Sequence, residues 1–360
     1  MEWALIATAL FLAFNNGAND NFKGFATVWG SDTLNYRQAL ILATLATLAG
    51  SLASWLLADT MVQQFSGKGL VPSAVASAPA FIFSVACAAA LTVFLATRLG
   101  LPISTTHALI GGLVGAGLGQ AGGHVDFHKL GQAFFMPLLL SPVLAAGLGV
   151  ILYKMVSARR AQSDCVCIIE GTPLGSLATP AGNAVLSTRM PQILASSNAN
   201  CDTLATQARF SISDFLKRIH IASAATICFA RALNDTPKLA ALLMAAQFTH
   251  AELPIALVGI FMAIGGLVFA KRVAYTMSQK VNRMDDAQGL TANLITAGLV
   301  LMASKFGLPV STTHVSVGAI AGVGASAGTL NWHALRSILL SWLATLPLAV
   351  AIAWTVSKLL

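Results

Sequence analysis

The stretch Gly100-Leu101-Pro102-Ile103-Ser104-Thr105-Thr106-His107 recurs 207 residues later as Gly307-Leu308-Pro309-Val310-Ser311-Thr312-Thr313-His314. In the same register, three glycines that follow the first copy fall on glycines that follow the second: Gly111, Gly115 and Gly117 on Gly318, Gly322 and Gly324. A shared stretch made mainly of Gly, Pro and polar positions indicates an internal duplication.

A second repeated motif precedes each of these stretches. Asn19-Asp20-Asn21-Phe22-Lys23 matches Asn234-Asp235-Thr236-Pro237-Lys238 at a separation of 215 residues. Between the copies, residues 157–217 are rich in Ser, Thr, Asn, Pro and Gly, with scattered charges that include Arg159, Arg160, Asp164 and Asp202. This composition is typical of a linker. We therefore predict a first transmembrane repeat over residues 1–156, a polar linker over 157–217 and a second transmembrane repeat over 218–360.

The composition predicts a membrane protein. Of the 360 residues, 56% are hydrophobic and 9% are charged, whereas about 25% are charged in an average soluble domain. The mean hydropathy is +0.75, and ten apolar runs of spanning or nearly spanning length occur between residues 3 and 357. We expect an all-α polytopic protein. Five segments per half, an odd number, would give two inverted-topology repeats with broken or re-entrant helices at their interface.

The net charge of +8 does not indicate nucleic acid, because the basic residues lie mainly in loops between apolar segments. If the N-terminus is outside, most of them face the cytoplasm, which is the positive-inside pattern: Arg37, Arg98, Lys154, Arg159, Arg160, Lys217, Arg218, Lys271, Arg272, Lys280, Arg283 and Arg336. The other side receives Lys68, Lys129, Lys305 and Lys358. We expect a multi-pass protein of the cell inner (plasma) membrane with both termini external and a cytoplasmic linker.

The five cysteines lack the paired spacing of a zinc site or a disulfide framework. Cys165 and Cys167 form a lone Cys-x-Cys, which we interpret as two free thiols. We expect no metal, no cofactor and no catalytic residue.

The repeated Gly-Leu-Pro-x-Ser-Thr-Thr-His motif has the composition of a helix break inside the membrane. Its glycine and proline end one helical segment and preset the backbone of the next, which the hydroxyls can cap. The free N–H groups and positive dipole end of the new helix suit a tetrahedral oxyanion. The alternative is a kink whose hydroxyls bond only to their own helix, and the duplication favours the binding site. The candidate hydroxyls are those of Ser104, Thr105, Thr106, Ser311, Thr312 and Thr313.

Two carboxyl groups, Asp20 and Asp235, lie within apolar segments, where an ionised group is costly unless it is paired. Lys23 and Lys238 follow three residues later, on the same helix face. These pairs either fix the helices as buried ion pairs or take part in transport by contacting the substrate or changing protonation. We predict the second role.

Arg231 stands where the first half has Asn16. Its guanidinium either contacts the oxyanion in a bidentate manner or snorkels at the membrane edge, and we include it among the candidate site residues. His107 and His314 end the hydroxyl motifs. We interpret them as hydrogen-bonding braces of the broken helices and not as a proton relay.

The two motifs resemble those of the PiT family of inorganic phosphate transporters, whose halves each carry Gly-x-Asn-Asp near the start and Pro-x-Ser-Thr-Thr-His later. The resemblance covers nearly the whole chain. It implies secondary active symport of phosphate by alternating access, usually with sodium and in some bacterial members with protons. It also implies that Asn19 and Asn234 join the hydroxyls in the anion site, and that Asp20 and Asp235 coordinate the coupling cation.

The chain departs from the family pattern at Lys23 and Lys238, where members carry the last Asn of Asn-Asp-x-x-Asn. An ammonium group donates hydrogen bonds but cannot coordinate sodium. We therefore expect protons to be coupled to phosphate. Sodium-coupled phosphate symport and a permease for sulfate or another tetrahedral oxyanion remain alternatives.

Two other classes of protein deserve comparison. An intramembrane hydrolase could use paired aspartates, but here each aspartate has its own lysine, and Gly17-Ala18-Asn19-Asp20 lacks the Gly-x-Gly-Asp pattern of aspartyl membrane proteases. A channel would not need the duplicated broken helices, which favour a transporter. The expected partners are phosphate or sulfate, the coupling ion and the lipid bilayer, with a homodimer left open.

Overall fold

The computed structural model describes residues 1–57, 65, 67, 69–120, 122, 124–158, 165–169, 192–203, 206–245 and 252–360. The chain divides into two compact units: unit 1 comprises Met1–Lys154 and His220–Leu360, and unit 2 comprises Met155–Ile219. Four charged residues discussed above lie outside the described residues: Lys68, Arg159, Arg160 and Asp164.

The helices confirm a polytopic α-helical membrane protein. In chain order they are α1 (Glu2–Asp20), α2 (Ala26–Gly30), α3 (Tyr36–Ala53), η1 (Ser54–Leu57), α5 (Ser73–Ala76), α6 (Pro79–Leu99), α7 (Thr105–Gln120), α8 (Phe127–Leu130), η2 (Gly131–Phe135), α9 (Met136–Ala158), α10 (Asn198–Thr203), α11 (Ile212–Met244), α12 (Glu252–Phe269), α13 (Lys271–Tyr275), η3 (Thr276–Val281), α14 (Asp286–Lys305), α15 (Thr312–Ala327) and α16 (Trp332–Leu359). Within the described residues, six helical segments are long and apolar enough to cross a membrane: Tyr36–Leu56, Pro79–Leu99, Phe127–Ala158, Glu252–Phe269, Asp286–Lys305 and Trp332–Leu359.

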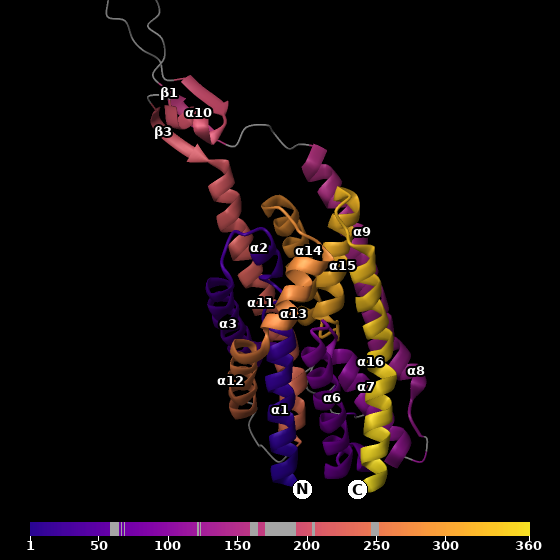
Figure 1. The fold of residues 1–360 in the computed structure, drawn as a ribbon. Coiled ribbons are helices and arrows are strands. Elements are labelled where there is room, and N and C mark those ends of the chain that lie inside the picture. The colour runs from indigo at the N-terminus through magenta and orange to yellow at the C-terminus, as the bar shows by residue number, and fades with distance from the viewer. Residues whose placement is uncertain are drawn as a thin grey trace, which may run out of the picture. The chain divides into compact units, whose positions relative to one another are not determined.

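The duplicated eight-residue stretches form the turns of two helical hairpins, α6–α7 and α14–α15. Gly100 and Gly307 have φ values of 71° and 65°, a backbone conformation that glycine adopts readily at the end of a helix. Ser104 and Ser311 then accept hydrogen bonds from the N–H groups of the histidines three residues later, at 3.1 and 3.2 Å, and so cap the second helix of each hairpin. The predicted helix breaks are therefore present in both halves. Figure 1 shows α6 and α7 in the lower part of unit 1, and α14 and α15 in the upper part.

Glycines let each hairpin pack closely on a long helix from the other half of the chain. A Cβ on Gly115 of α7 would collide with the backbone of Val350 in α16, and one on Gly322 of α15 would collide with that of Ala146 in α9. Only small residues permit such an approach of two helix backbones. Gly115 and Gly322, which share a register in the sequence, therefore have the same packing role in both halves.

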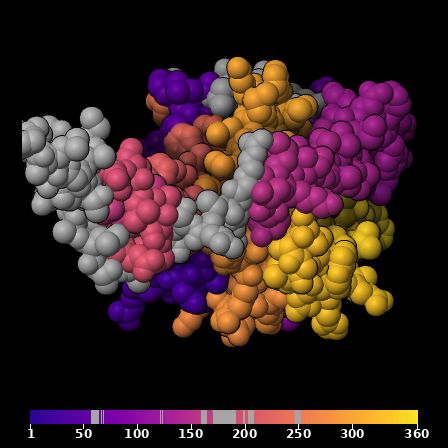
Figure 2. All heavy atoms as spheres, turned by 90° about the horizontal axis from the view of Figure 1, so that it is seen from above, coloured from indigo at the N-terminus to yellow at the C-terminus, as the bar shows by residue number. Residues whose placement is uncertain are grey.

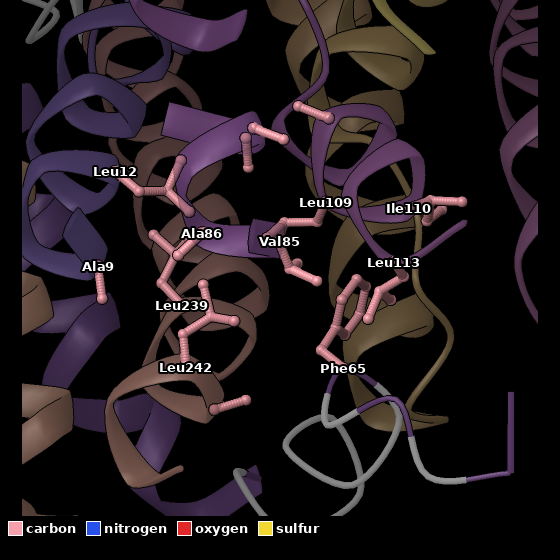
Figure 3. Close-up of a cluster of buried hydrophobic side chains, with 14 of the residues drawn as sticks. Ala9, Leu12, Phe65, Val85, Ala86, Leu109, Ile110, Leu113, Leu239 and Leu242 are labelled. Carbon is pink, nitrogen blue, oxygen red and sulfur yellow. The ribbon is translucent and has the colours of Figure 1, made fainter. Parts of the chain in front are cut away.

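An apolar cluster joins the two halves. Leu12 of α1, Val85 of α6, Leu109 of α7 and Leu239 of α11 meet there (Figure 3), and none is more than 1% exposed. Since α11 belongs to the second half and the other three helices to the first, burial of this apolar surface holds the halves together. Seen from above, indigo residues of the first half and orange and yellow residues of the second appear on one face (Figure 2).

Unit 2 contains a small antiparallel sheet with the strand order β2-β1-β3, formed by β1 (Cys165–Ile169), β2 (Gln192–Ser196) and β3 (Thr206–Ser211). The composition of the predicted polar linker gave no indication of these strands. In β1, the buried Cys165 and Cys167 alternate with the more exposed Val166 and Ile168, and this period of two is typical of a strand.

The interpretation of Cys165 and Cys167 as two free thiols is wrong for Cys167. Cys167 forms a disulfide with Cys201 of α10, and their Cα atoms lie 6.0 Å apart. Cys165 is free and buried. The bonded cysteines are 34 residues apart in the sequence, and only the folding of the sheet against α10 brings them together.

Candidate functional site

The repeated Asn-Asp motifs of α1 and α11 meet the two hairpin turns inside unit 1. The turns touch directly, because the Thr313 hydroxyl donates to the Ile103 carbonyl at 2.7 Å and the Thr106 hydroxyl donates to the Val310 carbonyl at 3.4 Å. Beside them lie four buried charged side chains, none more than 4% exposed: Asp20, Lys23, Asp235 and Lys238. The structure therefore gathers the predicted acidic, basic and hydroxyl residues in one place.

The Lys238 ammonium is surrounded by oxygen atoms from both halves. Its Nζ lies 3.1 Å from a carboxylate oxygen of Asp235, 3.1 Å from the Val310 carbonyl, 3.0 Å from the Thr106 hydroxyl and 2.6 Å from the side-chain oxygen of Asn234. A carboxylate, a carbonyl, a hydroxyl and an amide oxygen are also the kinds of ligand that hard cations take.

The surroundings of Lys23 repeat this pattern. Its ammonium contacts Asp20, the Ile103 carbonyl at 3.2 Å and the Thr313 hydroxyl. Each lysine thus bonds the aspartate and a hairpin carbonyl of its own half, and a threonine of the other half. The two lysines are equivalent in the sequence repeat and share these three kinds of partner, whereas the bond to a neighbouring asparagine is made by Lys238.

Arg231 is buried in this site, with 1% of its surface exposed, and does not lie at a membrane edge. Its guanidinium donates to the Asn16 side-chain oxygen at 3.0 Å and to the Thr47 hydroxyl at 3.1 Å, and it lies 3.9 Å from Asp235. Its Nε has no hydrogen-bond partner among the described residues. One donor of a buried cation is therefore left for a further acceptor.

Asn19 and Asn234 hold the hairpins. The Asn19 amide donates to the Thr97 hydroxyl and to the Leu101 carbonyl, both at 3.0 Å, and its oxygen accepts from the Ile103 N–H at 3.2 Å. Asn234 donates to the Ser304 hydroxyl at 2.9 Å and accepts from Lys238. These contacts position the hairpins and leave Asn19 little free hydrogen-bonding capacity.

The six candidate hydroxyls take different roles. Ser104 and Ser311 cap helices, and Thr106 and Thr313 bond the lysines and the opposite hairpin turn. Thr105 accepts from the Asn16 amide at 2.9 Å. Thr312 occupies the equivalent position in the second hairpin, and both threonines are 5% exposed.

The two histidines that end the hydroxyl motifs pack against each other. The rings of His107 and His314 have centroids 4.5 Å apart in an edge-to-face arrangement, and His314 also packs against Trp342 at 3.7 Å. Both ring nitrogens of His314 and Nδ1 of His107 lack hydrogen-bond partners among the described residues. The histidines brace the turns by ring packing, and not by the hydrogen bonds that we expected.

Asn16 was not among the candidate residues, although it is central to the site. Its amide lies 2.9 Å from Thr105, 3.4 Å from Asp20 and 3.5 Å from Asp235, while its oxygen accepts from Arg231. The sequence held a signal for it, because Asn16 and Arg231 occupy equivalent positions in the repeat. Their direct contact crosses the boundary between the halves.

The charge of the cluster suits an anion. Three cationic side chains, Lys23, Arg231 and Lys238, accompany two carboxylates, Asp20 and Asp235. When all five are ionised, the cluster has one surplus positive charge, which is costly in a buried site without an anion. Among the described residues, no group of three or more His, Cys, Asp or Glu side chains is arranged to hold a metal ion.

The chain is similar to known proteins over nearly its whole length. The chain is 28% identical to a protein of Pyrococcus furiosus that is provisionally named a phosphate permease, over 97% of this chain and 93% of that protein. It is 26% identical to the chloroplastic inorganic phosphate transporter 2-1 of Arabidopsis thaliana, over 100% of this chain and 73% of the plant protein. A solved structure described as the sodium-dependent phosphate transporter has the same fold, with a TM-score of 0.77, 21% sequence identity and coverage of 99% of this chain and 98% of that one.

The chain also matches the pattern shared by one protein family, and the match extends over almost the entire chain. It covers residues 16–353, and so includes both Asn-Asp motifs and both hairpins. The chain therefore belongs to the phosphate transporter family.

Proposed function

We propose that this protein carries inorganic phosphate across the inner membrane by alternating access of two inverted repeats, and that the coupling ion is a proton. The observation that carries the proposal is the paired set of buried lysines, each held by an aspartate, a carbonyl and a threonine. The family and the names of the relatives support phosphate as the cargo.

The position of the lysines supports proton coupling. Each ammonium has the oxygen ligands that a sodium ion would need, so the positive charge beside each aspartate is already supplied by the chain. The remaining surplus charge balances a phosphate monoanion without a metal cation. A divalent phosphate would need one proton in addition, either on the anion or on an aspartate.

The paired contacts also support alternating access. Thr106 and Thr313 hold both the lysines and the opposite hairpin turn, so the two turns close on each other in this conformation. Entry of phosphate between the turns would replace these contacts by hydrogen bonds to phosphate oxygens. The released lysines would then face the anion, and the two hairpins would open in turn to opposite sides.

Transport by purified protein in liposomes tests this function. We expect uptake of radiolabelled phosphate to rise as the external pH falls, to collapse with a protonophore, and to change little when choline replaces sodium. The anion should be recovered chemically unchanged, as a transporter requires and a hydrolase does not. Strong sodium dependence at fixed pH and membrane potential would contradict proton coupling, and preferential counterflow of sulfate would contradict the assigned cargo.

A further inference from the structure

A second basic region of unit 1 lies outside the hairpin site. Four cationic side chains, Arg98, Lys271, Arg272 and Lys280, line a cavity of about 600 Å³ between α6 and the α12–η3 segment. Among the described residues that line this cavity, none is an aspartate or a glutamate. None of the ion pairs between described residues includes any of the four cations.

Aromatic rings and one backbone contact hold the cations in place. The Arg98 guanidinium lies 5.0 Å from the ring centre of Phe94 and 5.4 Å from that of Phe269. The Arg272 guanidinium donates to the Arg98 carbonyl at 2.7 Å, and the Lys280 ammonium lies 5.9 Å from the ring centre of Tyr275. These contacts order the side chains but do not neutralise their charge.

The cavity adjoins the hairpin site but has its own charged residues. Thr97 lines the cavity and accepts a hydrogen bond from Asn19, which holds the first hairpin turn. None of the charged residues of the hairpin site lines the cavity. The cavity and the hairpin site therefore adjoin at Thr97 and at Gly100, which begins the first hairpin turn.

We propose that this cavity binds the phosphate group of an anionic ligand, at a site distinct from the one between the hairpins. Four cations without a carboxylate repel one another, and a bound anion would relieve that repulsion. Arginine and lysine are the side chains that bind phosphate groups most readily. The group belongs either to an anionic lipid, because basic pockets between membrane helices bind lipid headgroups, or to free phosphate. The proposal does not depend on which ion drives transport.

Two binding measurements on one pair of variants test the proposal and distinguish the sources. The test variant combines Arg98→Gln with Lys280→Gln. The control combines Arg336→Gln with Lys305→Gln, which also removes one arginine and one lysine, both exposed and neither lining the cavity. Lipid binding is measured by native mass spectrometry with phosphatidylglycerol and phosphatidylcholine, and free phosphate by equilibrium dialysis of the radiolabelled anion in uncharged detergent.

We expect the wild type and the control to prefer phosphatidylglycerol, and the test variant to bind it about tenfold more weakly. Loss confined to the dialysis would identify free phosphate as the ligand instead. If the test variant matches the control in both measurements, the proposal is wrong. Thermal melting confirms that each variant is folded, and should the double variant fail to fold, Lys271→Gln alone provides the same comparison with Lys305→Gln.

Discussion

At the scale of single residues, removing the hydroxyl of Thr105 or Thr312 tests whether the hairpin turns form an anion site or only a kink. We expect Thr105→Val or Thr312→Val to weaken phosphate affinity about tenfold or more, because a lost hydrogen bond to a charged group costs about 1.5–3 kcal/mol. Concentration-dependent uptake measures the effect. Thr8→Val is the matched control, since the Thr8 hydroxyl bonds the Ala4 carbonyl of its own helix at an exposed position. Unchanged affinity in both hairpin variants would leave these hydroxyls with a structural role only.

Variants of Lys23 and Lys238 test the proposed proton coupling. Replacing both lysines by Asn removes two buried positive charges and supplies amide oxygens that can coordinate sodium. We expect the double variant to lose the stimulation of uptake by low external pH and to gain dependence on sodium, measured in liposomes with choline as the replacement cation. Lys305→Asn, outside the site, should keep the wild-type response. A double variant that retains the wild-type pH response would show that the lysines only fix the helices.

At the scale of helices, the glycines of α7 and α15 set the distance to α16 and α9. A Cβ on Gly115 would meet the Val350 backbone, whereas one on Gly147 of α9 would meet nothing within 4 Å. We therefore expect Gly115→Ala to lower stability by about 1–3 kcal/mol through overpacking. Gly147→Ala should raise it by about 0.5–1 kcal/mol, because alanine favours a helix. Melting temperatures of the two variants in detergent test this difference, and equal effects would contradict the assigned packing.

At the scale of the whole molecule, the positive-inside pattern predicts the orientation. Figure 1 draws both termini at one end of unit 1, consistent with termini on the same side of the membrane. In a variant without native cysteines, an impermeant maleimide should label Lys358→Cys in intact cells, and Gln192→Cys only after permeabilisation. Both positions are exposed. Labelling of Gln192→Cys from outside would show that the orientation is opposite to the predicted one.

The redox state of the unit 2 cysteines gives an independent test of the orientation in the membrane. The structure shows the oxidised form, with Cys167 bonded to Cys201. A cytoplasmic unit 2, as the positive-inside pattern predicts, would instead hold both thiols reduced in the cell, since disulfides persist mainly in oxidising compartments. We expect Cys167 and Cys201 to be alkylated in cells whose thiols are trapped with a membrane-permeant reagent before lysis, and to form their disulfide after purification in air. A disulfide already present in the trapped cells would indicate an external unit 2.

The sequence alone determined the class of protein and the local structure of the site. Apolar runs predicted membrane helices, and Gly100, Gly307 and the Ser-Thr-Thr stretches predicted the helix breaks, because backbone conformation and helix capping depend on residues within a few positions of one another. The duplication predicted which residues are equivalent. It therefore identified the two lysines and the two aspartates before their contacts were known.

Only the tertiary structure decided which partners those residues have. Lys23 meets Thr313, which is 290 residues away, and Arg231 meets Asn16, 215 residues away. The disulfide of Cys167 and the basic cavity around Arg98 likewise join segments that are distant in the sequence. No local preference selects such pairs. They form because the packing of helices against one another, through glycine contacts and buried apolar surface, fixes where each buried polar group must find its hydrogen-bond partner.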